Sequence, residues 1–186
     1  MPPRMKEKFE NEVGPKVAER FGIGNRLARP RLEKIVINVG MGKALEGTKV
    51  KPQVKEQVLK DLASISGQKP IVIKAAKDVA NFKVRKGFET HAKVTLRGGR
   101  MWEFFDRLFA VAVPRIKDFR GLSEKGFDKA GNYSFGVAEQ GIFPEINMAE
   151  ATATHGMNIN FVFTNSDPEK SRFVLTEMGV PFRRPQ

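Results

Sequence analysis

The chain has 186 residues, and its 33 Lys and Arg against 21 Asp and Glu give a formal net charge of +12 at pH 7. Because 40% of the residues are hydrophobic, including 15 Phe, the chain can bury the core of a single domain over residues 1–186 and is not a disordered basic tail. The absence of cysteine excludes disulfide scaffolds, thiolate metal sites and cysteine nucleophiles.

The N-terminal segment carries charges where a secretory signal needs an apolar stretch. The longest purely apolar run, residues 108–113, is far shorter than the roughly 18 residues that span a bilayer. We therefore expect a cytoplasmic protein without a membrane segment. A compact protein with this much positive charge usually has a polyanionic partner, and nucleic acid is the leading candidate.

The first half of the chain predicts helices and strands in alternation. Apolar residues at every fourth position predict a pair of amphipathic helices over residues 5–21, interrupted near Gly14 and Pro15. A β-branched run predicts a strand over residues 32–39. Thr48 with Pro52 predicts the start of a helix that Gly67 ends. Three further strands are predicted over residues 70–76, 81–85 and 91–97.

The segment 91–97 shows a clear strand pattern, because Ala92, Val94 and Leu96 alternate with Lys93, Thr95 and Arg97. A period of two places the apolar residues on one face and the polar residues on the other. Residues 81–85 and 157–164 repeat the alternation. The sequence therefore predicts a sheet that is covered on one face only.

The second half predicts a strongly amphipathic helix over residues 101–112 that covers the apolar face and ends at Pro114. Residues 121–136 contain four glycines, and we expect a long loop there, which is often functional. A strand over residues 157–164 and a helix from Pro168 to Gly179 complete the chain.

Positive charge is concentrated between residues 69 and 100, where nine basic residues stand against two acidic ones. A single run of this kind is more often a solvated face that maintains solubility. Nine bases in 32 residues favour a surface that contacts phosphates. The nine are Lys69, Lys74, Lys77, Lys83, Arg85, Lys86, Lys93, Arg97 and Arg100.

Known catalytic motifs fail in this sequence. A dinucleotide fingerprint that begins at Gly40 has Leu45 in its third glycine position, and the phosphate-loop spacing from Gly42 ends in Thr48-Lys49 instead of Lys-Ser/Thr. The two histidines, His91 and His155, lie 64 positions apart without a helical partner. We therefore expect no catalytic residue, no metal site and no cofactor.

Five segments, in the correct order, resemble the bacterial large-subunit ribosomal proteins of the L-five family, which bind 5S rRNA. The likeness extends from about residue 4 to Phe182. The segments are RLEKIVINVG at 31–40, SGQKP at 66–70, AKVTLRG at 92–98, PRIKDFRG at 114–121 and FPEI at 143–146.

The resemblance implies an α+β fold: one domain with a mostly antiparallel sheet of about five strands, helices on one face and a polar, basic surface toward RNA. It also implies that Asn38, Gln68 and Thr95 contact 5S rRNA. Amides and hydroxyls can bond phosphates, sugars or base edges. The alternatives are a strand-end turn role for Asn38 and ordinary solvent exposure for Gln68 and Thr95. The RNA-binding set is completed by the cations Lys69, Lys74, Lys77, Lys83, Arg85, Lys86, Lys93 and Arg97.

The family further implies a structural, non-enzymatic protein that anchors 5S rRNA in the central protuberance of the large ribosomal subunit. Its expected partners are 5S rRNA, 23S rRNA, P-site tRNA near the loop at residues 75–81, other proteins of the central protuberance, and a small-subunit head protein near residues 121–136. The alternative is a free-standing basic RNA-binding protein or RNA chaperone of the same fold. A nucleotide-dependent enzyme is disfavoured by the failed phosphate loops.

Overall fold

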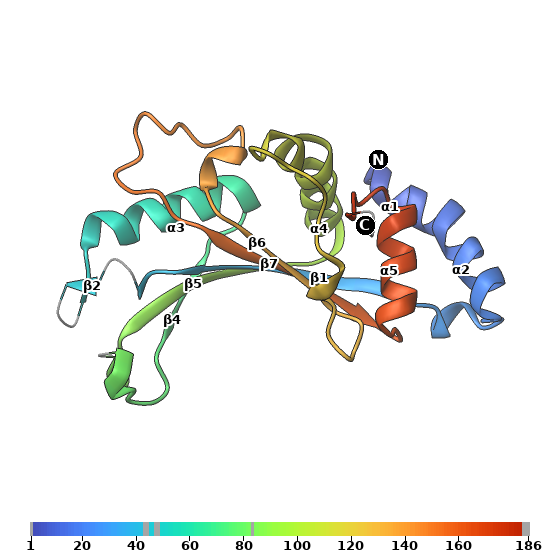
Figure 1. Cartoon of the computed structure of the whole chain (residues 1–186), viewed down its shortest axis with the longest axis horizontal. Helices are drawn as coiled ribbons and strands as arrows, with labels where there is room; N and C mark the ends of the chain where they lie inside the picture. The colour runs from blue at the N-terminus through green and yellow to red at the C-terminus, as the bar shows by residue number, and fades with distance from the viewer. Residues whose placement is uncertain (1, 43–44, 47–48, 83, 184–186) are drawn as a thin grey trace. The chain divides into compact units, whose positions relative to one another are not determined.

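The computed structural model describes residues 2–42, 45–46, 49–82 and 84–183 and confirms the α+β class (Figure 1). Its α-helices are α1 (Arg4–Lys8), α2 (Gly14–Phe21), α3 (Pro52–Ser66), α4 (Gly98–Arg107) and α5 (Pro168–Glu177). Its strands are β1 (Arg31–Gly40), β2 (Leu45–Glu46), β3 (Lys49–Val50), β4 (Ile71–Lys74), β5 (Glu89–Leu96), β6 (Tyr133–Val137) and β7 (Met157–Thr164). Two π-helical turns, η1 (Phe9–Val13) and η5 (Leu108–Ala112), and short 3-10 turns complete the described elements.

Five strands form one antiparallel sheet in the order β4-β5-β1-β7-β6, and β2 pairs with β3 in a separate hairpin. The chain divides into two compact units. Unit 1 comprises Met1–Val36, Leu96–Phe135 and Ile159–Gln186, and unit 2 comprises Ile37–Thr95 and Gly136–Asn158. Both units contain strands of the sheet, and the single domain over residues 1–186 stays a prediction.

The predicted pair of N-terminal helices corresponds to α1 and α2 in unit 1, but the interruption near Gly14 and Pro15 is the π-helical turn η1, and the backbone stays helical throughout. The N–H of Gly14 bonds to the carbonyl of Phe9, five residues back, which is the spacing of a π-helix. Pro15 has no N–H to donate. The wider turn in front of Pro15 therefore keeps it within one continuous helix.

Helix α4 covers the apolar face of the sheet in unit 1, as predicted. Phe104 and Phe105 are buried, and the ring centroid of Phe105 lies 5.9 Å from that of Phe161 in β7. The helix begins at Gly98, earlier than predicted, and continues through η5 to Ala112. Strand β7 and helix α5 confirm the predictions for the C-terminal region.

The expectation of a long loop over residues 121–136 is wrong in its last part, where β6 forms an edge of the sheet. Asp128 organises the turn before β6, since its carboxylate accepts hydrogen bonds from Asn132 and from the N–H of Ala130. The hydrogen bond from the Asn132 side chain is the main reason that the pKa of Asp128 is lowered. The longer connection is the segment 138–156, which contains only the 3-10 turn Gln140–Ile142 between β6 and β7.

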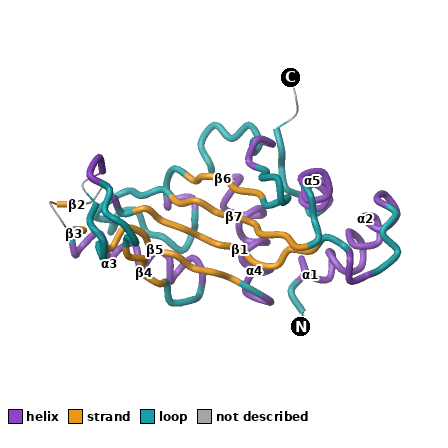
Figure 2. The backbone as a smooth tube through the Cα atoms, turned by 90° about the horizontal axis from the view of Figure 1, so that it is seen from below, coloured by secondary structure: helices purple, strands orange, loops and turns teal. Residues whose placement is uncertain are grey.

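Helix α3 covers the strands of unit 2 on one side (Figure 1), and Figure 2 looks onto these strands from the other side. Its buried residues include Val58, Leu62 and Ile65. The helix begins at Pro52, and Gly67 ends it with a left-handed φ of 62°, as the sequence predicts. Thr48 lies outside the described residues.

The predicted strand over residues 81–85 is wrong. Residues Ala80–Phe82 form a 3-10 turn, and one antiparallel bridge joins Val79 to Val84. This segment belongs to the loop between β4 and β5, where the Asp78 carboxylate accepts a hydrogen bond from the N–H of Lys86 at 2.7 Å. Because the chain reverses direction here, the alternation in the sequence does not correspond to a sheet strand.

Candidate RNA-binding surface

The pairing of β4 with β5 defines the two faces of the sheet in unit 2. Ile71 lies opposite Lys93, and Val72 lies opposite Ala92. Residues directly opposite each other point to the same face of a sheet. Because Ala92 is fully buried, Lys93 and Ile71 belong to the other face, which we call the open face.

Strand β1 adds Asn38 to this open face. The N–H of Met41 donates to the carbonyl of Thr90 at 2.9 Å, and Gly40 lies against the ring of His91. Counting two residues along each antiparallel strand from Gly40 and His91 places Asn38 beside Lys93. Asn38 is half-buried, whereas its neighbours in β1 are fully buried.

A cap at the end of α3 holds Gln68 beside Thr95. The Ser66 hydroxyl donates to the carbonyl of Leu62 at 2.6 Å and accepts from the N–H of Gln68 at 3.3 Å. The Gln68 side-chain Nε2 then donates to the carbonyl of Thr95 at 3.3 Å. The left-handed backbone at Gly67 turns the chain toward this contact.

The three neutral residues predicted from the resemblance therefore belong to one unit and lie on or beside one sheet face. Thr95 and Lys93 alternate with the buried Val94 on β5 and share the open face. Neither the Asn38 amide nor the Thr95 hydroxyl has a hydrogen-bond partner among the described residues. Both polar groups are available to a ligand.

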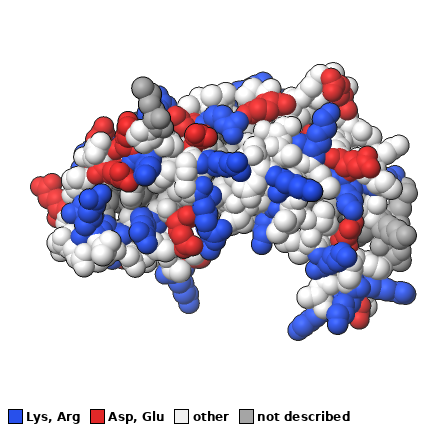
Figure 3. Space-filling model, turned by 180° about the vertical axis from the view of Figure 1, so that it is seen from behind, with Lys and Arg blue, Asp and Glu red and all other residues white. Residues whose placement is uncertain are grey.

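The loop between β4 and β5 projects from unit 2 and carries a cluster of basic side chains, at the lower right of Figure 3. One bridge and the Asp78 hydrogen bond order this loop. The predicted cations Lys77, Arg85 and Lys86 are exposed in this loop, Lys74 is exposed at the end of β4, and Lys69 is exposed next to Gln68. Lys83 lies outside the described residues, and Arg97 belongs to unit 1, where it is the exposed N-cap of α4.

Sequence reasoning missed two open-face residues, Ile71 and His91. Ile71 lies opposite Lys93, and His91 lies opposite Ile73. The four-residue strand β4 is too short for its alternation to separate the two faces by sequence. The pairing with β5 supplies that information.

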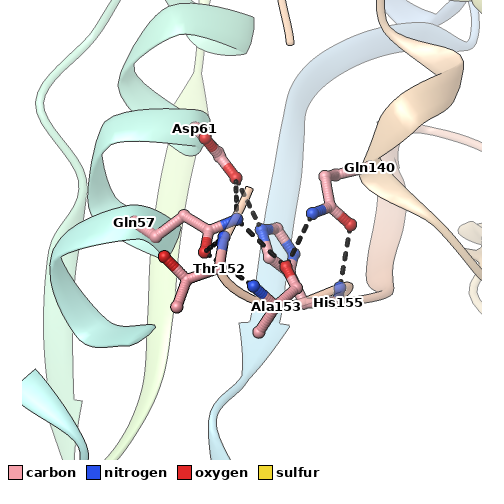
Figure 4. A network of polar contacts seen from close by, with 6 residues as sticks. All are labelled: Gln57, Asp61, Gln140, Thr152, Ala153 and His155. Carbon is pink, nitrogen blue, oxygen red and sulfur yellow. Dashed lines mark hydrogen bonds and ion pairs between the residues drawn. The ribbon is translucent and has the colours of Figure 1, made fainter. Parts of the chain in front are cut away.

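The two histidines have different surroundings, because His91 is exposed on β5 and His155 belongs to a partly buried polar network. His155 Nε2 lies 3.0 Å from Asp61 Oδ2 within a network that also contains Gln57 and Gln140 (Figure 4). Gln57 accepts hydrogen bonds from the N–H groups of Thr152 and Ala153 and donates to the Ala153 carbonyl. The network attaches the segment 138–156 to α3, which is a structural role.

The described residues contain no group of three or more His, Asp and Glu side chains that could hold a metal ion. A cavity of about 480 Å³ in unit 2 is lined by residues that include Lys55 and Glu89, which form an ion pair at 2.7 Å. In the part of the chain that the structure covers, no helix is long and apolar enough to cross a bilayer.

Comparisons with known proteins confirm the resemblance. Residues 25–85 match the family described as "Ribosomal protein L5", and residues 89–182 match the family that describes the C-terminus of the same ribosomal proteins. The chain is 47% identical over 182 residues to the large ribosomal subunit protein uL5 of Carboxydothermus hydrogenoformans, a match that covers 98% of this chain and 99% of the relative. It is 48% identical over 179 residues to uL5 of Desulforamulus reducens, covering 96% of this chain and 97% of the relative.

A third relative, uL5 of Anaeromyxobacter sp. strain Fw109-5, is 47% identical over 184 residues, which are 99% of this chain and 100% of the relative. The similarity extends over both compact units and over every segment that carries the sequence resemblance. The chain therefore belongs to the ribosomal protein L5 family and is a structural protein of the large ribosomal subunit, not an enzyme.

Proposed function

We propose that this protein binds 5S rRNA through the open sheet face of unit 2 and helps to anchor that RNA in the central protuberance. The observation that carries the proposal is the grouping of Asn38, Gln68, Lys93 and Thr95 in one unit, with Asn38, Lys93 and Thr95 on one face. The amide and hydroxyl groups suit sugar and base-edge contacts, while Lys93 suits phosphate. RNA helices present 2′-hydroxyls and base edges in a wide, shallow minor groove.

The loop between β4 and β5 is proposed to contact other RNA, namely P-site tRNA and 23S rRNA. Its exposed Lys77, Arg85 and Lys86 neutralise phosphates without reading sequence. Such contacts release counterions, so their contribution falls as salt increases. The tRNA contact rests on the family resemblance together with this charge.

We also propose that this protein contacts a small-subunit head protein and neighbouring proteins of the central protuberance. The resemblance implies that the segment 121–136 contacts the head protein. The segment 138–156 supports a protein partner as well, because it contains three acidic residues and no Lys or Arg. This charge disfavours phosphate and fits a basic protein surface.

The proposal is tested by identifying the RNA that copurifies with the tagged protein. We expect 5S rRNA at near-stoichiometric amounts, with the protein in the large-subunit fraction after a moderate-salt wash. Cytoplasmic localisation follows from membership of a bacterial ribosomal family. Recovery of mixed RNA with the protein outside the subunit fraction would favour the free-standing RNA-binding alternative.

A further inference from the structure

Ile71 is an exposed aliphatic residue on the open face of unit 2. It is the first residue of β4, an edge strand, and 59% of its surface is exposed. Single exposed hydrophobic residues are common on protein surfaces and need no explanation by themselves. The position of Ile71 within the sheet is what makes it informative.

The cross-strand row that contains Ile71 continues with Lys93 on β5 and Asn38 on β1. The next row on this face contains Ile73 opposite His91, and Ile73 is half-buried. The aliphatic surface of Ile71 and Ile73, which we call the β4 ledge, thus borders the polar groups proposed to bind RNA. Natural edge strands more often carry a charge at such an exposed position.

The residues around the β4 ledge favour RNA over an apolar protein partner. Lys69 and Lys93 are its cationic neighbours, and both suit a phosphate backbone. The strand residues of this face in unit 2 include no Phe, Tyr or Trp, and the imidazole of His91 is a small ring, so the face offers less than the usual platform for stacking single-stranded bases. An aliphatic group at the edge of a row that continues with a cation and an amide suits a ribose face instead.

We propose that Ile71 is an apolar contact for the ribose face of the bound RNA and that it supplies a salt-independent part of the affinity. This inference rests on the proposed RNA-binding function of the same face. Phosphate contacts release counterions and depend on salt, whereas burial of an aliphatic side chain removes apolar surface from water and releases no counterions. The two contributions can therefore be separated experimentally.

The test measures the affinity of Ile71→Ala and Ile71→Thr for 5S rRNA over a range of salt concentrations. We expect both variants to bind roughly three- to tenfold more weakly, since part of the aliphatic side chain is removed. The slope of log affinity against log salt should stay at the wild-type value. Ile71→Thr keeps a β-branched side chain, so the strand is retained if the alanine variant is less stable.

Leu27→Ala is the matched control, because Leu27 is also an exposed aliphatic residue, at 76%, but lies in unit 1 within the turn η2 (Arg26–Ala28). It should bind 5S rRNA like the wild type. Unchanged affinity of both Ile71 variants would overturn the inference. Binding of 5S rRNA by the wild-type protein would still support the proposed function in that case. A changed salt slope would show that Ile71 acts by displacing a cation, which also overturns it.

Two further outcomes are decisive. Loss of a neighbouring protein from assembled subunits, with unchanged 5S rRNA affinity, would assign the β4 ledge to a protein contact and contradict the inference. Failure of the wild-type protein to bind 5S rRNA would instead remove the proposed function on which the inference rests.

Discussion

Replacement of Gln57 by Ala should release the segment 138–156 from α3. Gln57 Oε1 accepts from the N–H groups of Thr152 and Ala153 at 2.9 and 3.0 Å, and its Nε2 donates to the Ala153 carbonyl at 3.0 Å. Each neutral hydrogen bond contributes about 0.5–1.5 kcal/mol net. Water can replace the bond to the exposed Thr152, which leaves the two bonds to Ala153. Their loss should lower the free energy that holds the segment on α3 by about 2 kcal/mol.

Because the contacts are local, this destabilisation should appear as local opening of the segment and not as complete unfolding. Amide hydrogen exchange at Ala153 should accelerate by about 30-fold, which corresponds to about 2 kcal/mol. Gln53→Ala is the matched control, since Gln53 is exposed one turn earlier on α3. Wild-type exchange at Ala153 in the Gln57→Ala protein would refute the assigned role of the network.

Three further predictions concern the positive charge of the loop between β4 and β5, the core residue Phe104 and the buried phenol of Tyr133. Replacing Lys77 and Arg85 by Ala should flatten the salt dependence of RNA affinity by roughly 0.7–0.9 log units for each phosphate that is no longer neutralised; an unchanged slope would assign both residues to solvent. Phe104→Ala should cost about 3–5 kcal/mol in chemical denaturation, because Phe104 is only 1% exposed; a normal unfolding midpoint would contradict its core position. Burial, with a smaller contribution from the charge of Glu124, raises the pKa of Tyr133 from 10.0 to about 12. Between these two pH values the unfolded chain loses the proton first, so stability should fall as pH rises above 10. Ultraviolet titration of this tyrosine, the only one in the chain, checks the shift, and a native titration at the unfolded value would contradict it.

Long periodic segments could be predicted from the sequence because their burial follows directly from side-chain alternation. Strand β7 and the apolar face of β5 agree with the predicted pattern, and Gly67 ends α3 as expected. The sequence around Pro15 predicts two helices, because local propensity treats proline as a break. The sequence did not show that the interruption is a π-helical turn that leaves the backbone helical.

Two failures concern strands, which are harder to predict because pairing in a sheet is not local. Residues 81–85 alternate like a strand but lie in a loop with one bridge. Strand β6 was not predicted, because it contains Gly136 and glycine is depleted in strands. In the structure Gly136 lies close to Asn158. The concentration of basic residues between 69 and 100 could be predicted from composition, but their place in a loop could not. The association of Asn38 with Lys93 requires the register of β1 against β5.

The most direct test of RNA binding by the open face is the affinity of Thr95→Val for 5S rRNA. The substitution keeps a β-branched side chain and removes no charge, so the fold and the salt slope should be retained. We predict that binding weakens by about 0.5–1.5 kcal/mol, or by about 1.5–3 kcal/mol if the hydrogen-bond partner is a phosphate, with weak binding to unrelated RNA unchanged. Asn38→Ala and Gln68→Ala should behave in the same way. Wild-type affinity for 5S rRNA in all three folded variants would contradict the assignment of this face.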